Sequence, residues 1–163
     1  MSYVWEQRKL GDIATFINGR TYKQKELLDS GKYPVLRVGN FNTNNKWYYS
    51  NLDLPAKNYA DKGDLLYTWA TAFGPHIWEG PRVVFHYHIW KVELSAVLTK
   101  GFTFQLLQAE QSRMTDSLNG STMVHITKET MEGKIVSIPT LNEQQDISNI
   151  LNALDNLIVH HQQ

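Results

Sequence analysis

The sequence contains no cysteine. Disulfide bonds and cysteine-ligated zinc are therefore excluded, and this composition fits a reducing compartment. No run of apolar residues approaches the roughly 18 that a membrane-spanning helix needs, and residues 1–11 carry charges where a secretory signal would be apolar. We therefore expect a cytoplasmic protein without a membrane segment.

The sequence also lacks net charge, because 16 basic residues balance 16 acidic ones. The two signs are unevenly distributed: residues 1–100 hold 13 Lys and Arg against 9 Asp and Glu, whereas residues 101–163 hold 3 against 7. A basic stretch favours contact with phosphate, so the front of the chain could face nucleic acid and the back a protein. The charge pattern alone is equally compatible with an ordinary solvated surface.

Sequence motifs of common enzymes are missing as well. The chain has no glycine-rich phosphate loop, no Gly-x-Ser-x-Gly nucleophile elbow and no His-Glu-x-x-His metal motif. It also lacks the Asn/Asp-Pro-Pro-Tyr/Phe signature of adenine methyltransferases, so we do not expect it to methylate DNA. We predict no catalytic residue, no metal site and no cofactor bound by this chain.

Three weaker patterns keep other classes open. Two carboxylates and a lysine imitate a Mg²⁺-dependent nuclease at Asp116, Glu132 and Lys134. Three histidines could seed a metal site, although no carboxylate or cysteine is placed to complete it: His76, His86 and His88. Five tryptophans and eight tyrosines would also suit a carbohydrate-binding surface.

Hydrophobic alternation and turn residues predict an α/β (α+β) domain with mixed or antiparallel strands and short helices. Strands are expected at 33–38, 65–69, 83–85, 88–94 and 134–138. Helices are expected at 102–118 and 126–131, with a helical turn at 24–28 and a short helix or strand entry at 10–17. Residues 39–46 and 70–81 are expected to be loops.

The C-terminal segment carries the clearest pattern. Thr140 and Glu143 have the spacing of a helix capping box. Behind them, apolar residues recur three and four positions apart to the end of the sequence: Ile147, Ile150, Leu154, Leu157 and Ile158. This pattern predicts a long coiled-coil helix at 139–163 that mediates dimerisation, after a recognition domain at 1–138. An ordinary core helix is the alternative.

The front of the chain combines amide and basic side chains. Asn pairs well with adenine and Arg with guanine, while Lys and Arg fix the register on phosphates. We therefore predict DNA contacts by Arg20, Lys23, Lys32, Arg37, Asn40, Asn42, Asn44, Asn45 and Lys46. Further candidates are Thr71, His76, Arg82 and His86. The Asn-rich loop is equally compatible with a generic turn.

The order of several motifs resembles the repeated half of Type I restriction–modification specificity subunits. Diffuse matches are Trp5–Asp12, Gly19, Tyr33–Arg37, Lys62–Leu66 and Asn119–Thr122 leading into Ile126. The most specific match is Ile138-Pro139-Thr-Leu-Asn-Glu143-Gln144-Gln145-Asp-Ile147, since a Pro-x-x-x-Glu-Gln-x-x-Ile run opens a long helix in these proteins. The resemblance extends over essentially the whole chain.

The resemblance implies a subunit without catalysis of its own that reads one half of a bipartite target in double-stranded DNA. Its long helix would pair with that of a second half as an antiparallel coiled coil and set the spacing of the half-sites. Modification and restriction subunits would dock on it and bring S-adenosylmethionine, ATP and Mg²⁺. Family subunits usually carry two recognition domains, so we expect a half-subunit that homodimerises or a fragment. A decoy scaffold that never contacts DNA is the alternative.

Overall fold

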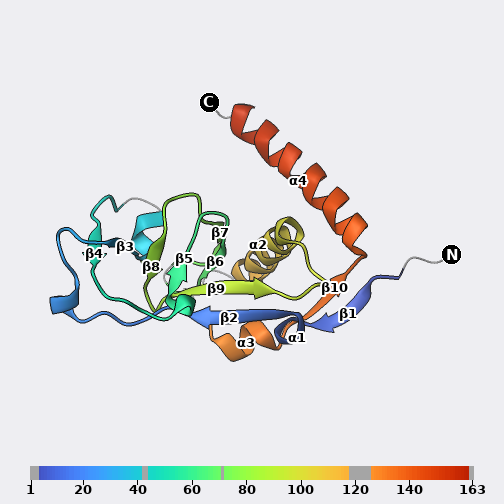
Figure 1. Ribbon diagram of the computed structural model, residues 1–163. Coiled ribbons are helices and arrows are strands. Elements are labelled where there is room, and N and C mark those ends of the chain that lie inside the picture. The colour runs from blue at the N-terminus through green and yellow to red at the C-terminus, as the bar shows by residue number, and fades with distance from the viewer. Residues whose placement is uncertain (1–3, 42–43, 71, 118–125, 162–163) are drawn as a thin grey trace.

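The computed structural model of the chain describes residues 4–41, 44–70, 72–117 and 126–161. Two four-stranded sheets and one two-stranded sheet carry a few helices (Figure 1). The predicted mixed α+β class with antiparallel pairing is confirmed. Within the described ranges, no helix is both long and apolar enough to cross a membrane.

The first four-stranded sheet is antiparallel throughout and has the order β2-β9-β6-β7. Its strands are β2 (Ala14–Asn18), β9 (Ile89–Leu94), β6 (Leu65–Thr68) and β7 (Gly74–Ile77). All four residues of β6 are buried, as expected for an inner strand. The turn before β6 contains Gly63 at a φ of 94°, a left-handed conformation that glycine adopts without strain.

The second four-stranded sheet has the order β4-β3-β8-β5. Its strands are β4 (Tyr48–Ser50), β3 (Tyr33–Leu36), β8 (Val83–Phe85) and β5 (Tyr59–Ala60). β3 and β8 are parallel, and the other pairs are antiparallel. Short 3-10 turns flank these strands at η1 (Gln24–Glu26), η2 (Val38–Phe41) and η3 (Ala56–Asn58). β8 and β9 follow each other closely in the chain but belong to different sheets, so the turn between them joins the two sheets.

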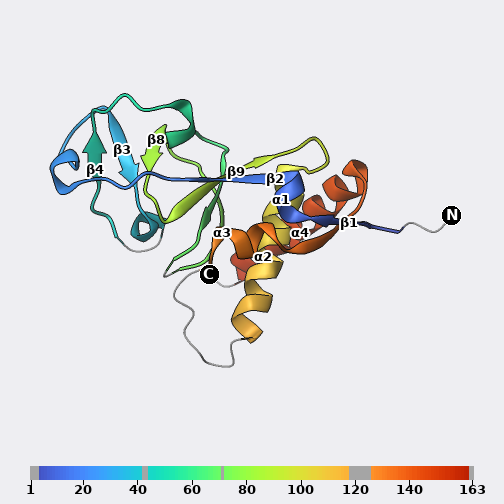
Figure 2. The same ribbon diagram turned by 90° about the horizontal axis from the view of Figure 1, so that it is seen from below.

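The third sheet joins segments that are far apart in sequence. β1 (Glu6–Lys9) pairs antiparallel with β10 (Ile135–Ile138), with Glu6 opposite Ile138. The short helices α1 (Leu10–Ile13) and α3 (Lys128–Glu132) contact each other and β2, close to this sheet (Figures 1 and 2).

Two apolar clusters hold the two large sheets in place. The first packs the β2-β9-β6-β7 sheet against the helices and includes Phe16, Tyr67, Trp90, Leu107 and Met131. The second joins the two sheets to each other through Leu36, Ala60, Leu66, Val83, Phe85 and Ile89. Complete burial of each Leu, Ile or Phe side chain stabilises the fold by roughly 1.5–3 kcal/mol, so both sheets belong to one packed unit.

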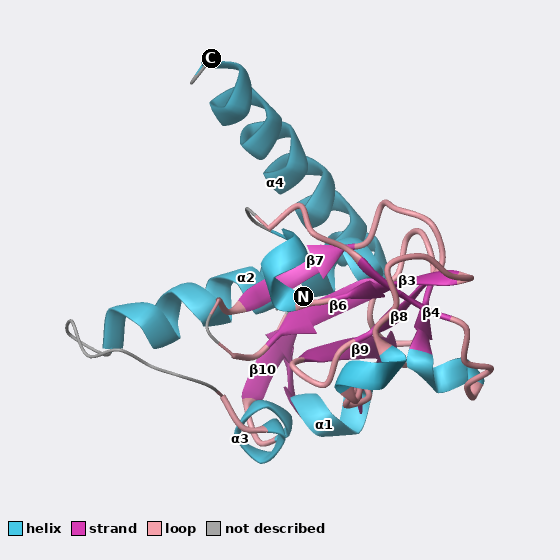
Figure 3. Cartoon of the chain, turned by 90° about the vertical axis from the view of Figure 1, so that its left-hand side faces the viewer, coloured by secondary structure: helices cyan, strands magenta, loops and turns pink. Residues whose placement is uncertain are grey.

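Two long helices complete the chain, α2 (Lys100–Ser117) and α4 (Leu141–His161). The first part of α4 packs on α2, and its C-terminal end stands clear of the sheets (Figures 1 and 3). Thr140 Oγ1 accepts the N–H of Glu143 at 3.3 Å, which is the predicted capping contact. A long C-terminal helix is therefore confirmed, whereas its pairing into a coiled coil stays a prediction.

Several sequence-based element boundaries were wrong. Residues 70–81, expected to be a loop, contain β7. Residues 10–17, expected to be a short helix or strand entry, contain both α1 and most of β2. The short strands β1 and β4 were missed. β1 pairs with β10 near the other end of the chain, and β4 pairs with β3 across a long connection, so tertiary pairing and not local pattern decides their conformation. β7 instead forms a hairpin with the preceding strand β6.

Candidate nucleic-acid interface

An open cleft of about 880 Å³ lies at strand ends that come from both four-stranded sheets. Its walls are formed by the last residue of β2, by residues that follow β3 and β6, by the β8–β9 turn with the start of β9, and by residues 126–128 at the start of α3. Its polar and aromatic side chains include Arg37, Trp69, His86, Tyr87, His88 and Lys128. No acidic side chain is among the described residues that line it. The cleft therefore combines positive charge with aromatic surface.

Trp69 is the centre of the aromatic wall. Its ring stacks on Trp90 with centroids 5.9 Å apart, and the rings of Tyr87 and His88 meet it at 5.1 and 5.0 Å. The indole Nε1 donates to the carbonyl of Tyr87 at 3.0 Å. Trp90 is almost completely buried, whereas Tyr87 is 39% exposed, so the wall runs from the core to the solvent.

The turn that carries His86 and His88 is held against the end of β2. Gly19 passes so close that a Cβ there would overlap the carbonyl of His86, so only glycine fits without a backbone shift. Burial, together with the neighbouring His88 and Arg37, lowers the pKa of His86 below its usual value. His86 is therefore neutral at neutral pH. Its Nδ1 accepts the backbone N–H of His88 at 3.4 Å, so its Nε2–H remains as a hydrogen-bond donor.

The amide of Asn40 organises the predicted DNA-reading loop from within. Its Oδ1 accepts the N–H of Arg37 at 3.0 Å, and its Nδ2 donates to the carbonyls of Asn44 at 3.1 Å and Lys46 at 3.0 Å. Asn44 Oδ1 in turn accepts the N–H of Lys46 at 2.9 Å. Both amides hold the loop in shape. The exposed amide of Asn45 has no hydrogen-bond partner among the residues that the structure describes.

Arg37 and Lys46 are both stacked on one ring. The guanidinium of Arg37 lies 4.7 Å and the ammonium of Lys46 4.9 Å from the centroid of Tyr48. Arg37 also donates to the carbonyl of Lys46 at 3.0 Å. Cation–π contacts thus keep two positive charges close together on Tyr48, and Arg37 brings one of them to the wall of the cleft.

Three other predicted basic side chains already have acidic partners, namely Arg20, Lys32 and Arg82. Arg20 is held by Glu26, and Lys23 donates its backbone N–H to the same carboxylate. Arg82 lies 3.6 Å from Asp61 and 4.3 Å from the ring of Tyr59.

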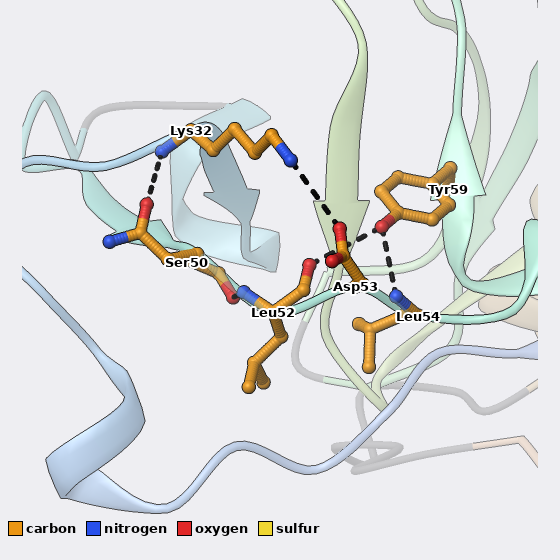
Figure 4. Close-up of polar contacts among 7 residues, drawn as sticks. Lys32, Ser50, Leu52, Asp53, Leu54 and Tyr59 are labelled. Carbon is orange, nitrogen blue, oxygen red and sulfur yellow. Dashed lines mark hydrogen bonds and ion pairs between the residues drawn. The ribbon is translucent and has the colours of Figure 1, made fainter.

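Lys32 lies 3.4 Å from Asp53, beside the Tyr59 hydroxyl that accepts from Leu54 (Figure 4). Exposed pairs such as Lys32–Asp53 contribute little stability, and a phosphate can therefore compete for the lysine.

His76 lies in a separate, smaller hollow. Its ring stacks on Phe41 with centroids 4.1 Å apart, and burial lowers its pKa. The other two histidines of the suggested metal group, His86 and His88, are 5.0 Å apart in the large cleft. Over the described part of the chain, no three His, Cys, Asp or Glu side chains come together as metal ligands.

The remaining sequence candidates are placed as follows. Asn42 and Thr71 lie outside the described residues, as does the side chain of Asp116 from the nuclease pattern. Lys134 of that pattern lies 3.7 Å from Glu110. Sequence reasoning missed Trp69 and Lys128 as cleft residues. Trp69 follows β6 and Lys128 begins α3, and only the fold brings these two distant segments together.

The apolar stripe of α4 is largely open to solvent. Ile150, Leu154, Leu157 and Ile158 are 61%, 49%, 55% and 54% exposed. Ile147 instead packs against the first core cluster. Four of the five predicted dimerisation residues are thus available to a partner, and the fifth attaches α4 to the domain.

The fold is an α+β domain of two four-stranded sheets and one two-stranded sheet, with a cationic and aromatic cleft. The chain belongs to the family of Type I restriction modification DNA specificity domains, whose model matches residues 4–163. The predicted family is confirmed, and with it the prediction that the chain is a specificity component and not a catalytic subunit.

Two curated relatives are specificity subunits of Type I restriction enzymes. The MjaVIII subunit of Methanocaldococcus jannaschii is 23% identical over 94% of this chain and 36% of its own length. The EcoBI subunit of Escherichia coli is 21% identical over 92% of this chain and 32% of its own length. The chain thus spans about a third of these relatives.

A solved structure agrees in fold. The HsdS subunit of Thermoanaerobacter tengcongensis superposes with a TM-score of 0.78 at 15% identity, over 98% of this chain and 39% of that one. At this identity the likeness concerns the fold alone.

Proposed function

We propose that this chain reads one part of a bipartite target in double-stranded DNA as a recognition half of a Type I specificity subunit. The observation that carries the proposal is the cleft where Arg37, Lys128 and His86 converge, in a chain of this family. No acidic side chain is among its described lining residues. Cationic side chains fix a protein on phosphates, and neutral amides and imidazoles can read base edges.

Within this proposal the loop after β3 is one wall of the reading surface. Asn45 is the base-reading amide, because its neighbours Asn40 and Asn44 are engaged in the loop. Arg37 and Lys46 supply charge from the ring of Tyr48. Flanking phosphate contacts are assigned to three residues that would exchange an acidic partner for DNA, which are Arg20, Lys32 and Arg82. Further flanking contacts are assigned to Lys23, Asn42, Thr71 and His76.

We further propose that residues 1–138 act as the recognition domain and that the helix at 139–163 connects it to a second half. The exposed residues Ile150, Leu154, Leu157 and Ile158 form a seam that suits an antiparallel partner helix. Modification and restriction subunits are the proposed further partners, and S-adenosylmethionine, ATP and Mg²⁺ belong to them.

The proposal is tested by selection from random duplex DNA, followed by affinity measurements at several salt concentrations. Specific binding should weaken with salt, because neutralised phosphates release counterions. Arg37→Ala should reduce affinity for the selected site by roughly tenfold or more.

The matched control is Arg8→Ala, on β1 at the opposite end of the molecule from β3, which should bind like the wild type (Figure 1). A wild-type chain without salt-dependent DNA binding would be a decoy scaffold, and the proposed function would be wrong.

A further inference from the structure

One buried amide, that of Gln144, fixes the base of α4 to the recognition domain. Its Oε1 accepts the N–H of Thr99 at 2.8 Å, and its Nε2 donates to the carbonyls of Val97 at 2.8 Å and Pro139 at 3.0 Å. The residue is completely buried. A single side chain thus joins the β9–α2 connection, the β10–α4 connection and α4 itself.

Contacts along one side of α4 extend this attachment. Gly101 on α2 faces Ser148, and a Cβ at Gly101 would lie 3.0 Å from Ser148 Oγ, so the two helices approach as closely as glycine permits. Further along, Gln105 donates to Asn152 at 3.1 Å and to Asp155 at 3.2 Å. From residue 144 to 155, about three turns of α4 are aligned against α2.

The hydrogen bonds of Gln144 are suited to fixing the orientation of α4, and not only to attaching it to the domain. Apolar contact is non-directional, whereas three hydrogen bonds from one planar amide fix both the position and the rotation of the helix. The next residue, Gln145, has the same side chain but is exposed and donates only to Asn149 within α4. Of these two adjacent glutamines, Gln144 forms the directional link between α4 and the domain, and Gln145 does not.

We propose that Gln144 is a positioning residue that sets the direction in which α4 leaves the domain, and thereby the spacing at which a second recognition half meets DNA. This inference rests on the proposed function, because it requires α4 to connect two DNA-reading halves. A helix of 21 residues is about 32 Å long, so a tilt of about 10° at its base moves its far end by roughly 5 Å. That displacement exceeds the roughly 3.4 Å rise of one base pair.

The first test measures the direction of α4 without DNA. Because the chain has no cysteine, Lys57→Cys and Asn156→Cys provide two unique exposed spin-label sites, and dilution with unlabelled chain removes distances between copies. We expect Gln144→Leu to broaden or shift the distance distribution and Gln145→Leu to leave it unchanged.

Gln144→Glu serves as a second variant if Gln144→Leu does not fold. The ionised carboxylate can still accept from Thr99 but cannot donate to Val97 or Pro139. Acid should restore one donor and narrow the distribution again. An unchanged distribution in the folded variants would overturn the inference.

The second test measures spacing on DNA with the half-site selected by the wild type. Gln144→Leu should keep its affinity for a single half-site within about twofold, because the cleft is distant from the junction. On inverted repeats it should lose the wild-type preference among spacers that differ by one base pair.

Equal spacer preference in wild type and Gln144→Leu, or none in the wild type, would overturn the spacing role. If the wild type did not bind DNA at all, the proposed function would fail as well. The distance measurement would then still decide whether Gln144 fixes α4.

Discussion

The guanidinium of Arg20 donates to both carboxylate oxygens of Glu26, at 3.0 and 3.1 Å. Glu26 also accepts the backbone N–H of Lys23 at 3.0 Å, so one carboxylate closes the bend between β2 and η1. The hydrogen bonds from Arg20 and then from Lys23 lower the pKa of Glu26 to about 2. Tyr22 lies within this bend and is buried. Burial raises the pKa of its hydroxyl to about 12.

Glu26→Gln should reduce stability at neutral pH and not in strong acid. The ionised carboxylate stabilises the fold above its ordinary pKa of 4.5, and this contribution disappears as the pH falls from 4.5 through about 2. Urea titration at pH 7 should therefore give a lower free energy of unfolding for the variant than for the wild type. At pH 3 the difference between the two free energies should be smaller. An equal difference at both pH values would contradict the assignment.

Asn40→Ala should destabilise the fold by about 1 kcal/mol, because the N–H of Arg37 and the carbonyl of Asn44 lose their partner in the loop. The carbonyl of Lys46 keeps its hydrogen bond from Arg37. Asn45→Ala is the matched control and should leave stability unchanged. The two variants should also differ in DNA binding. Asn45→Ala should change which base is preferred, whereas Asn40→Ala should lower the affinity for all DNA sequences by a similar factor. Denaturation curves and competition among duplexes measure both effects.

Lys128→Ala should lower the salt dependence of DNA binding. Loss of one phosphate contact reduces the slope of log affinity against log salt by about one. Lys9→Ala, on β1 away from the cleft, should retain the wild-type slope. If both variants kept the wild-type slope, Lys128 would not contact phosphate.

Leu154→Glu should abolish self-association if α4 pairs two copies of the chain. Its side chain is 49% exposed in the apolar stripe, and a charge there opposes burial in a helix seam. Size exclusion with light scattering should give a mass near twice 18.8 kDa for the wild type and 18.8 kDa for the variant. The control Asn156→Glu lies off the stripe and should remain dimeric. A monomeric wild type would remove the homodimer from the proposal.

The affinity for DNA should depend on pH because of the protonation of His86. Its pKa lies below the usual 6.5, so the free chain keeps this ring neutral at neutral pH. A nearby phosphate would raise that pKa, and affinity should then increase as the pH falls below 6.5. His86→Asn should lose this increase, whereas His160→Asn at the exposed end of α4 should not. Anisotropy at constant ionic strength measures the change.

The sequence predicts features that depend on local pattern. The heptad spacing behind Thr140 gives α4, and the turn at Lys62-Gly63-Asp64 places β6. The cleft is different, because it is assembled from segments whose contact depends on strand pairing across long separations. Arg37 and His86 were found through their residue types, whereas Lys128 carries no local signal that separates it from any other surface lysine.

The engaged amides show a second limit of sequence reading. Asn40, Asn44 and Asn45 look equivalent along the chain, yet two of them serve the loop itself. Hydrogen-bond partners of a side chain are set by backbone geometry, and composition alone does not contain that geometry.

The pairing of β1 with β10 has a consequence for how such a domain can change over time. Because residues 6–9 lie beside residues 135–138, the chain enters and leaves the domain at a single place. A unit with adjacent entry and exit can be replaced by another of the same kind without moving the segments on either side. Recombination at these two strands would thus exchange everything between them in one event, including the cleft, while α4 stays as it is.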